Sequence, residues 1–192
     1  MNNVNLIYDI KDITAESDYQ QEPVSIDEMK DYLRLEGFVD EDESTTESLS
    51  NFDFDDILIA DMIVAARKKM EKFLGVSLVF HTWKVLFTNL AGDIEFPYGP
   101  VQDLTSLAYK SGTAVGDSSI YTYGYDFLHL EAPLGEKMTA IYDAGYEECP
   151  EAVALAIKQC VSHWYENRIT GEVPSIAKAT ASPYKRAWTW LT

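Results

Sequence analysis

A cysteine and a histidine three positions apart are the residues of this chain whose types and spacing could do chemistry. Cys160 and His163 lie in a stretch with helical apolar spacing, where a three-residue offset brings side chains to one side of a helix. Such a pair could form a nucleophile with its base, or half of a zinc site. A buried cysteine beside a partly exposed histidine is the commoner arrangement. We therefore expect no catalytic residue, no cofactor and no metal ligand, and predict that the chain is not an enzyme.

The other motifs that carry chemistry are missing or incomplete in the sequence. It contains neither a glycine-rich phosphate loop nor a Gly-x-Ser-x-Gly nucleophile turn. Asp40, Asp42 and Ser44 have the first offsets of a calcium loop, but position six is Thr45 and position twelve is Asn51. A calcium loop needs a glycine and a bidentate acid at those two positions. We interpret the segment from Val39 to Asn51 as an exposed acidic loop.

The two cysteines and the apolar stretches indicate in which cellular compartment the chain folds. Cys149 and Cys160 are 11 positions apart, and a helix would separate them by about 16 Å, beyond the roughly 7 Å limit for a disulfide. We expect two free thiols and folding in a reducing cytoplasm. The first residues lack the basic start of a signal peptide, and the apolar stretch 57–66 is short and interrupted by Asp61. Neither export nor a membrane partner is expected.

The charge of the chain is strongly uneven. The formal net charge is −17, and residues 1–56 hold 17 acidic against 3 basic side chains. An acidic surface repels a phosphate backbone, so sequence-specific DNA binding is not expected. From residue 168 onward the sign reverses, with four basic side chains against Glu172. The acidic and basic ends could attract each other between copies, or both could be solvated termini.

Three segments have the apolar spacing of amphipathic helices, namely 25–35, 54–74 and 150–168. Ser25 and Glu28 form a capping box at the start of the first. Asp53 is predicted to cap the second, and Pro150 is expected at the first position of the third. The side chains predicted to be buried in the two long helices are Ile59, Met62, Ile63, Ala66, Met70, Phe73, Leu74, Val153, Ala156, Ile157, Cys160, Val161 and Trp164.

Between the two long helices the apolar period changes from 3.6 to 2, over residues 80–146. The predicted fold class is α+β, an antiparallel bundle of one short and two long helices with an inserted antiparallel β layer. A central domain over 25–168 is thus flanked by an acidic arm, 1–24, and an extended C-terminal arm, 169–192. Aromatic residues alternate at Tyr121, Tyr123, Tyr125 and Phe127. They could form a ligand platform or cross-strand aromatic pairs.

Several segments follow one another in a specific order over residues 25–168. They are Ser-Ile-Asp-Glu-Met-Lys-Asp-Tyr-Leu-Arg-Leu from residue 25, Ile-Val-Ala-Ala-Arg-Lys-Lys-Met-Glu-Lys-Phe-Leu-Gly from residue 63, Thr82-Trp83, Pro97-Tyr98-Gly99-Pro100-Val101-Gln102, Tyr142-Asp143-Ala144-Gly145-Tyr146, Pro150-Glu151 and His163-Trp164-Tyr165-Glu166-Asn167-Arg168. This order resembles the tailed-phage head–tail connector family of adaptor or head-completion proteins. The chain departs from simpler members in its acidic N-terminal arm, in its long acidic loop and in its tail, where Val173-Pro174 is followed by a different pattern.

The resemblance implies a structural virion protein of the neck, assembled in the host cytoplasm. Family members dock as a ring of twelve copies beneath the portal and extend the DNA channel toward the tail. The expected partners are copies of the same chain, the portal, the next neck or tail protein, and double-stranded DNA that passes without specific binding. The alternatives are another neck protein, such as a stopper or tail-completion protein, and a virion module whose Tyr-rich β layer recognises glycans.

Two groups of residues are candidates for these contacts. The tail is too apolar and aromatic for a free terminus, and Trp, Tyr and Arg are common interface anchors. We expect the tail to bind the portal or a neighbouring subunit, and to be removable from residue 170 without unfolding the chain. Its candidate residues are Tyr184, Lys185, Arg186, Trp188, Trp190 and Leu191. The candidate channel-facing acidic residues, which would keep DNA from adhering, are Asp40, Glu41, Asp42 and Glu43.

Overall fold

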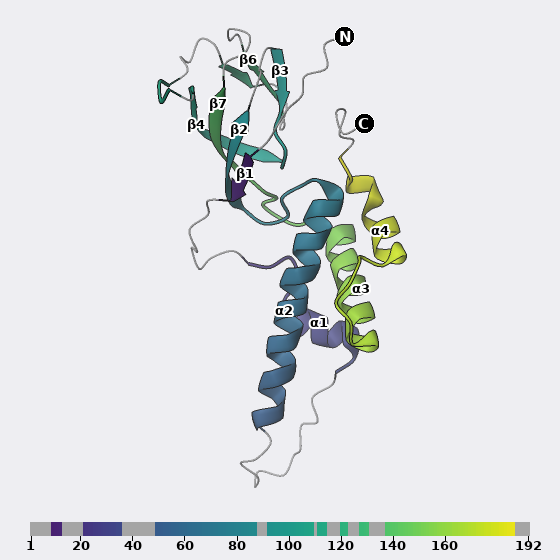
Figure 1. Cartoon of the computed structure of the whole chain (residues 1–192). Coiled ribbons are helices and arrows are strands. Elements are labelled where there is room, and N and C mark those ends of the chain that lie inside the picture. Colours follow the sequence, from purple (N-terminus) through teal and green to yellow (C-terminus); the bar gives the residue numbers. More distant parts are fainter. Residues whose placement is uncertain are drawn as a thin grey trace. The chain divides into compact units, whose positions relative to one another are not determined.

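The computed structural model describes residues 9–12, 21–35, 49–87, 92–109, 111–114, 120–122, 127–130 and 137–186 (Figure 1). The chain divides into two compact units. We call them the β unit, Met1–Gln20 with Gly75–Glu147, and the helical unit, Gln21–Leu74 with Glu148–Thr192. Helices and antiparallel strands are both present, so the predicted α+β class is confirmed. The predicted central domain, 25–168, contains parts of both units.

The helical unit is built around two long helices. Helix α3 packs against both α2 and α4, and the short α1 contacts α2 and α3. In Figure 1 the green α3 lies beside the blue α2, and the yellow α4 lies along α3. The helical elements are α1 (Ile26–Leu33), α2 (Leu49–Leu74), α3 (Glu151–Asn167), α4 (Ser175–Ala181) and the 3₁₀ turn η2 (Ser182–Tyr184).

The predicted buried stripes of α2 and α3 form the core of the helical unit. All thirteen side chains are buried except Phe73, which is half-buried at the last turn of α2. Trp164 is the largest fully buried side chain, and its indole Nε1 donates a hydrogen bond to the Glu172 carbonyl at 3.3 Å. An indole N–H in a core needs such an acceptor. The residues after α3 therefore help to complete the core.

The helix starts agree with the sequence in part. The capping box of α1 is present, with the Glu28 N–H donating to the Ser25 hydroxyl and the Ser25 N–H to the Glu28 carboxylate. Helix α2 begins at Leu49, five residues before the predicted start, so Asp53 lies inside the helix and does not cap it. Acidic residues suit any position near a helix start, which is why Asp53 was a misleading signal. Pro150 precedes α3 as its N-cap and is not the first helical residue.

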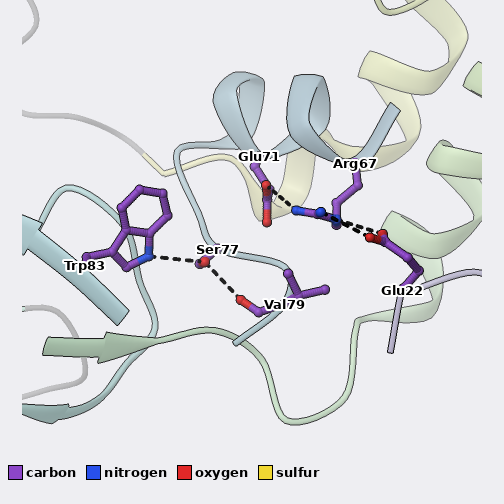
Figure 2. A network of polar contacts seen from close by, with 6 residues as sticks. All are labelled: Glu22, Arg67, Glu71, Ser77, Val79 and Trp83. Carbon is purple, nitrogen blue, oxygen red and sulfur yellow. Dashed lines mark hydrogen bonds and ion pairs between the residues drawn. The ribbon is translucent and has the colours of Figure 1, made fainter. Parts of the chain in front are cut away.

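The segment before α1 is fixed to α2. Val24 is fully buried, and Glu22 accepts two hydrogen bonds from the guanidinium group of Arg67, which also donates to Glu71. Figure 2 shows Arg67 between the two carboxylates. Arg67 is only 6% exposed, so its charge is held by partners rather than by water. Part of the predicted acidic arm, residues 21–24, is thus integrated into the helical unit.

The β unit consists of two antiparallel sheets. The larger has the strand order β1-β2-β7-β4 and the smaller the order β3-β6-β5. The predicted β layer is therefore present, as two sheets rather than one. The strands are β1 (Asp9–Asp12), β2 (His81–Phe87), β3 (Gly92–Glu95), β4 (Val101–Tyr109), β5 (Ile120–Thr122), β6 (Phe127–Leu130) and β7 (Met138–Ala144).

The core of the β unit lies on the face where strands β2 and β7 alternate inward. Val85 is paired with Ala140, and both are fully buried. Trp83 stacks on Tyr98 with ring centroids 4.3 Å apart, and its Nε1 donates to the Ser77 hydroxyl at 3.4 Å. Figure 2 shows this indole and the hydrogen bond from Ser77 to the Val79 carbonyl. The buried cluster comprises Val85, Phe87, Phe96, Leu107, Met138, Ala140, Tyr142 and Ala144.

Both terminal arms contain secondary structure that the sequence analysis did not assign. Strand β1 lies in the predicted acidic arm and pairs antiparallel with β2, from Asp9 opposite Leu86 to Asp12 opposite Trp83. The predicted extended C-terminal arm, 169–192, contains α4 and η2. Ala177 and Ala181 of α4 are fully buried. Residues 169–186 are therefore a folded part of the helical unit.

Candidate partner-binding site

The C-terminal candidate residues lie near the end of α2. After α4, the turn η2 ends at Tyr184, and the N–H of Arg186 donates to the Leu74 carbonyl at 2.9 Å. That bond satisfies a carbonyl in the last turn of α2, which has no partner within its own helix. The structure thus fixes where the remaining tail starts, namely beside the C-terminal end of α2.

Aromatic and basic side chains meet at this place. The ammonium groups of Lys185 and Lys178 lie 4.8 Å and 5.9 Å from the ring centroid of Phe73. Both distances are within the range of cation–π attraction, worth about 0.5–1 kcal/mol at exposed sites. Lys178 also forms an ion pair with Glu172 at 3.5 Å, and the ring of Tyr184 is exposed. The start of the tail is therefore a positively charged surface around Phe73.

The structure brings together three of the predicted site residues and leaves the others undetermined. Tyr184, Lys185 and Arg186 are adjacent at the end of α2, as described above. The remaining C-terminal candidates, Trp188, Trp190 and Leu191, lie outside the described residues, as do all four candidate acidic loop residues, Asp40, Glu41, Asp42 and Glu43. Their roles remain predictions.

A second surface of the helical unit is an apolar groove between α2 and the C-terminal end of α3. It has a volume of about 750 Å³. It is lined by the apolar or aromatic side chains of Leu58, Met62, Tyr165 and Ile169 and by the polar residues Glu166, Arg168 and Thr170. Leu58 is 44% exposed and Ile169 is 57% exposed, so large apolar area faces the solvent here. We call this surface the α2–α3 groove.

The end of α3 creates one wall of the groove. Arg168 adopts the left-handed conformation, with φ of 51°, and the N–H of Ile169 donates to the Trp164 carbonyl at 3.2 Å. This is the hydrogen-bond pattern of a Schellman motif, in which the chain reverses sharply after the helix. The reversal sets Ile169 beside Tyr165, at the side of α2 that carries Leu58. A side chain other than glycine in this conformation is uncommon.

Leu58 and Ile169 were not among the residues predicted from the sequence. Met62 was predicted to lie in the buried stripe of α2, and it is only 6% exposed. Leu58 precedes Met62 by one helical turn and widens the apolar face beyond the part that α3 covers. An isoleucine directly after a helix end was the second available signal. Both signals identify an apolar surface but not its partner.

Cys160 and His163, the pair considered above for chemistry, lie in different environments. Cys160 is fully buried, and burial raises the pKa of its thiol to about 12 although Lys69 opposes the shift. Burial likewise raises the pKa of Cys149 to about 11, and both cysteines are free thiols, as predicted. His163 is exposed on α3. A thiol held neutral in a core is neither a good nucleophile nor a good metal ligand.

Within the part of the chain that the structure describes, no group of three or more His, Cys, Asp or Glu side chains is placed to hold a metal ion. The described helices also include none that is both long and apolar enough to cross a bilayer. Of the predicted aromatic platform, Tyr123 and Tyr125 lie outside the described residues, and so do the side chains of Tyr121 and Phe127.

Comparisons with known proteins identify the fold. No protein-family model matches the sequence, and no curated protein is similar to it in sequence. A chain in the virion of a native gene transfer agent (GTA) particle has the same fold, with a TM-score of 0.71 and 18% identity over 96% of this chain and 98% of that chain. A chain in the neck of an empty GTA particle, computed with C6 symmetry, has a TM-score of 0.71 and 16% identity over 95% and 98%.

A third similar structure covers less of the chain. It belongs to the neck of a native GTA particle, computed with C12 symmetry, and has a TM-score of 0.56 and 18% identity over 73% of this chain and 90% of that chain. At these identities the likeness is one of fold. It includes the helices and strands that carry both surfaces described above, since the first two matches extend over nearly the whole chain.

Proposed function

We propose that this chain is a head–tail connector, or adaptor, in the neck of a tailed phage-like particle. In this role it forms a ring beneath the portal, extends the DNA channel and joins head to tail. The observation that carries the proposal is the match of fold over 96% of this chain and 98% of a GTA virion chain, with a second match to a GTA neck chain. A fold shared over the whole length by neck chains favours a role in the same place.

A ring of this chain requires two different surfaces on each subunit, because neighbours in a closed ring meet head to tail. The helical unit offers two such surfaces, the α2–α3 groove and the aromatic and basic surface around Phe73. The similar neck structures were computed with C6 and with C12 symmetry, and the C12 neck supports a ring of twelve copies. No cofactor is needed for such an assembly.

The charge of the chain suits a passage for double-stranded DNA. The net charge is −17, and residues 1–56 account for −14 of it, with 17 acidic against 3 basic side chains. Acidic side chains facing a channel repel phosphates and so let DNA pass without binding. We assign this role to the loop that contains Asp40, Glu41, Asp42 and Glu43.

The partners of the C-terminal residues follow from their chemistry. Tyr184, Lys185, Arg186, Trp188, Trp190 and Leu191 combine aromatic rings with positive charge, a composition typical of interface anchors. In the proposed neck they bind the portal or a neighbouring subunit, and the tail side of the ring binds the next neck protein. Assembly takes place in the host cytoplasm, and the mature location is the virion.

Electron microscopy of particles with and without the chain tests the proposal. We expect density for a ring of this chain beneath the portal, and tailless heads when the chain is not produced. Density on the tail side of another ring would instead assign a stopper or tail-completion role. Absence of the chain from purified particles would refute the proposed function.

A further inference from the structure

The α2–α3 groove lacks an assigned partner, although four of its seven lining side chains, those of Leu58, Met62, Tyr165 and Ile169, offer apolar surface. Leu58 and Ile169 expose 44% and 57% of their surface beside Met62 and Tyr165. Exposed apolar surface gains about 25 cal/mol for each Å² that a partner removes from water. A groove of about 750 Å³ is large enough for bulky side chains. Its occupant should therefore be apolar and large.

The tail of this chain has that chemistry. The residues after Arg186 read Ala-Trp-Thr-Trp-Leu-Thr, with Trp188 and Trp190 two positions apart. Each tryptophan side chain can bury roughly 150–250 Å². The groove lining adds polar partners, because the Glu166 carboxylate can accept an indole N–H and the Arg168 guanidinium can lie over an indole ring. The tail and the groove are thus complementary in size and chemistry.

A tail cannot place both tryptophans in the groove of its own subunit. Arg186 is hydrogen-bonded to the Leu74 carbonyl, at the end of α2. Along the helix, Met62 lies about 18 Å and Leu58 about 24 Å from Leu74 at a rise of 1.5 Å per residue. An extended chain carries the Cα of Trp188 at most about 7 Å and the Cα of Trp190 at most about 14 Å from Arg186, so the Trp188 indole does not reach Met62 even with its own length added. Occupation of the groove by both indoles therefore requires a second copy of the chain.

We infer that residues 188–191 of one copy dock in the α2–α3 groove of the next copy. The contact joins two different surfaces of the same chain, so it is heterologous and extends from copy to copy until the rotation closes a ring. This inference deepens the proposed function, on which it rests for the closed ring. It commits the C-terminal residues to a neighbouring subunit as their partner.

The test uses two variants of the full chain and their mixture. Trp188→Ala with Trp190→Ala removes the inserted side chains, and Ile169→Asp places a charge in the groove wall. Each variant alone should raise the dissociation constant for self-association by about thirtyfold or more, the loss typical of interface hot spots. Mixed together, they should form dimers and nothing larger. The groove variant supplies the one intact tail and the tail variant supplies the one intact groove, so a single contact can form. Sedimentation velocity measures these species.

A matched control separates the groove from general surface effects. Ile57 is 58% exposed and adjacent to Leu58 in sequence but lies outside the groove lining, so Ile57→Asp should assemble like the parent chain. Far-ultraviolet circular dichroism should show that each variant retains its helices. Unchanged assembly of the tail and groove variants, a mixture that remains monomeric, or a parent chain that is monomeric at all concentrations would overturn the inference.

These outcomes are distinct from failure of the proposed function. Rings that form without the tail would contradict the tail contact and leave the connector role intact. Particles that lack the chain would contradict the connector role and leave the tail contact of the purified chain intact.

Discussion

The guanidinium group of Arg67 forms a two-point ion pair with Glu22, which lies 45 positions earlier in the chain. Its Nε donates to one carboxylate oxygen at 2.7 Å and its Nη2 to the other at 3.1 Å, while Nη1 donates to Glu71 at 3.0 Å. Burial lowers the pKa of Arg67, but the hydrogen bonds and charges of Glu22 and Glu71 outweigh this effect, so the pKa is raised. Arg67 thereby anchors the segment before α1 to α2.

Replacement of Arg67 by alanine should reduce the free energy of unfolding by about 3–5 kcal/mol, because two carboxylates lose their buried partner. Urea denaturation of the purified chain measures the change. Lys158→Gln is the control, because it removes an exposed ion pair with Glu28 at 3.8 Å that is worth at most about 1 kcal/mol. Equal effects of the two substitutions would contradict the anchoring role of Arg67.

Gly145 in the β unit should not tolerate a side chain. Its φ is 150°, and a Cβ atom would lie 2.5 Å from the Val79 carbonyl oxygen and 2.7 Å from the Phe80 Cα. Gly145→Ala should therefore lower the free energy of unfolding by about 2–3 kcal/mol, because the backbone at Gly145 or at Val79 and Phe80 must move to make room for the Cβ atom. Gly171→Ala serves as the control. Among the residues that the structure describes, none lies within 4 Å of its added Cβ, and the change should be within about 0.5 kcal/mol.

Two truncations of the tail should have different effects on stability. Deletion from residue 170 removes α4 with its buried Ala177 and Ala181, and the carbonyl that accepts the Trp164 indole N–H. We expect the melting temperature to fall by about 10 °C or more, contrary to the expectation of a removable arm. Deletion from residue 187 should lower it by less than about 2 °C. Thermal unfolding is measured on dilute, monomeric protein, and equal melting temperatures would contradict the role of α4.

The buried thiol of Cys160 should make the chain less stable at high pH. Its pKa is about 12 in the folded chain against an ordinary value of 9.0, so the unfolded chain loses the proton first as pH rises. Below pH 9 the thiol is protonated in both states and does not change the free energy of unfolding with pH. Between pH 9 and the folded pKa, the free energy of unfolding falls by about 1.4 kcal/mol per pH unit. We expect Cys160→Ala to show a shallower decline of unfolding free energy between pH 9 and 11. Parallel declines in both chains would contradict the pKa shift.

The features that the sequence predicted well are those with a strong apolar period. Trp164 and its partners in α3 repeat at three and four residues, and every predicted position is buried. Trp83, Val85 and Phe87 fall at every second position, which identifies β2, although not its pairing with β7. Periodicity reports which face of an element is apolar. It does not report which distant element covers that face.

The features that the sequence missed depend on long-range contacts or on small side chains. Strand β1 reads Asp-Ile-Lys-Asp, and its pairing with β2 comes from backbone hydrogen bonds that composition does not reveal. Helix α4 buries Ala177 and Ala181, which give a much weaker signal than leucine or tryptophan. Of the candidate site, the position of Lys185 beside Phe73 could not be predicted, because the turn after α4 sets it.

The chain passes between its two units three times, after residues 20, 74 and 147. A protease that cuts any one of these connections leaves the units joined by intact peptide bonds elsewhere. Because three connections join the two units, one proteolytic cut between them does not separate the chain into two fragments that each hold a whole unit. Two consecutive domains joined by a single linker would be separated by such a cut.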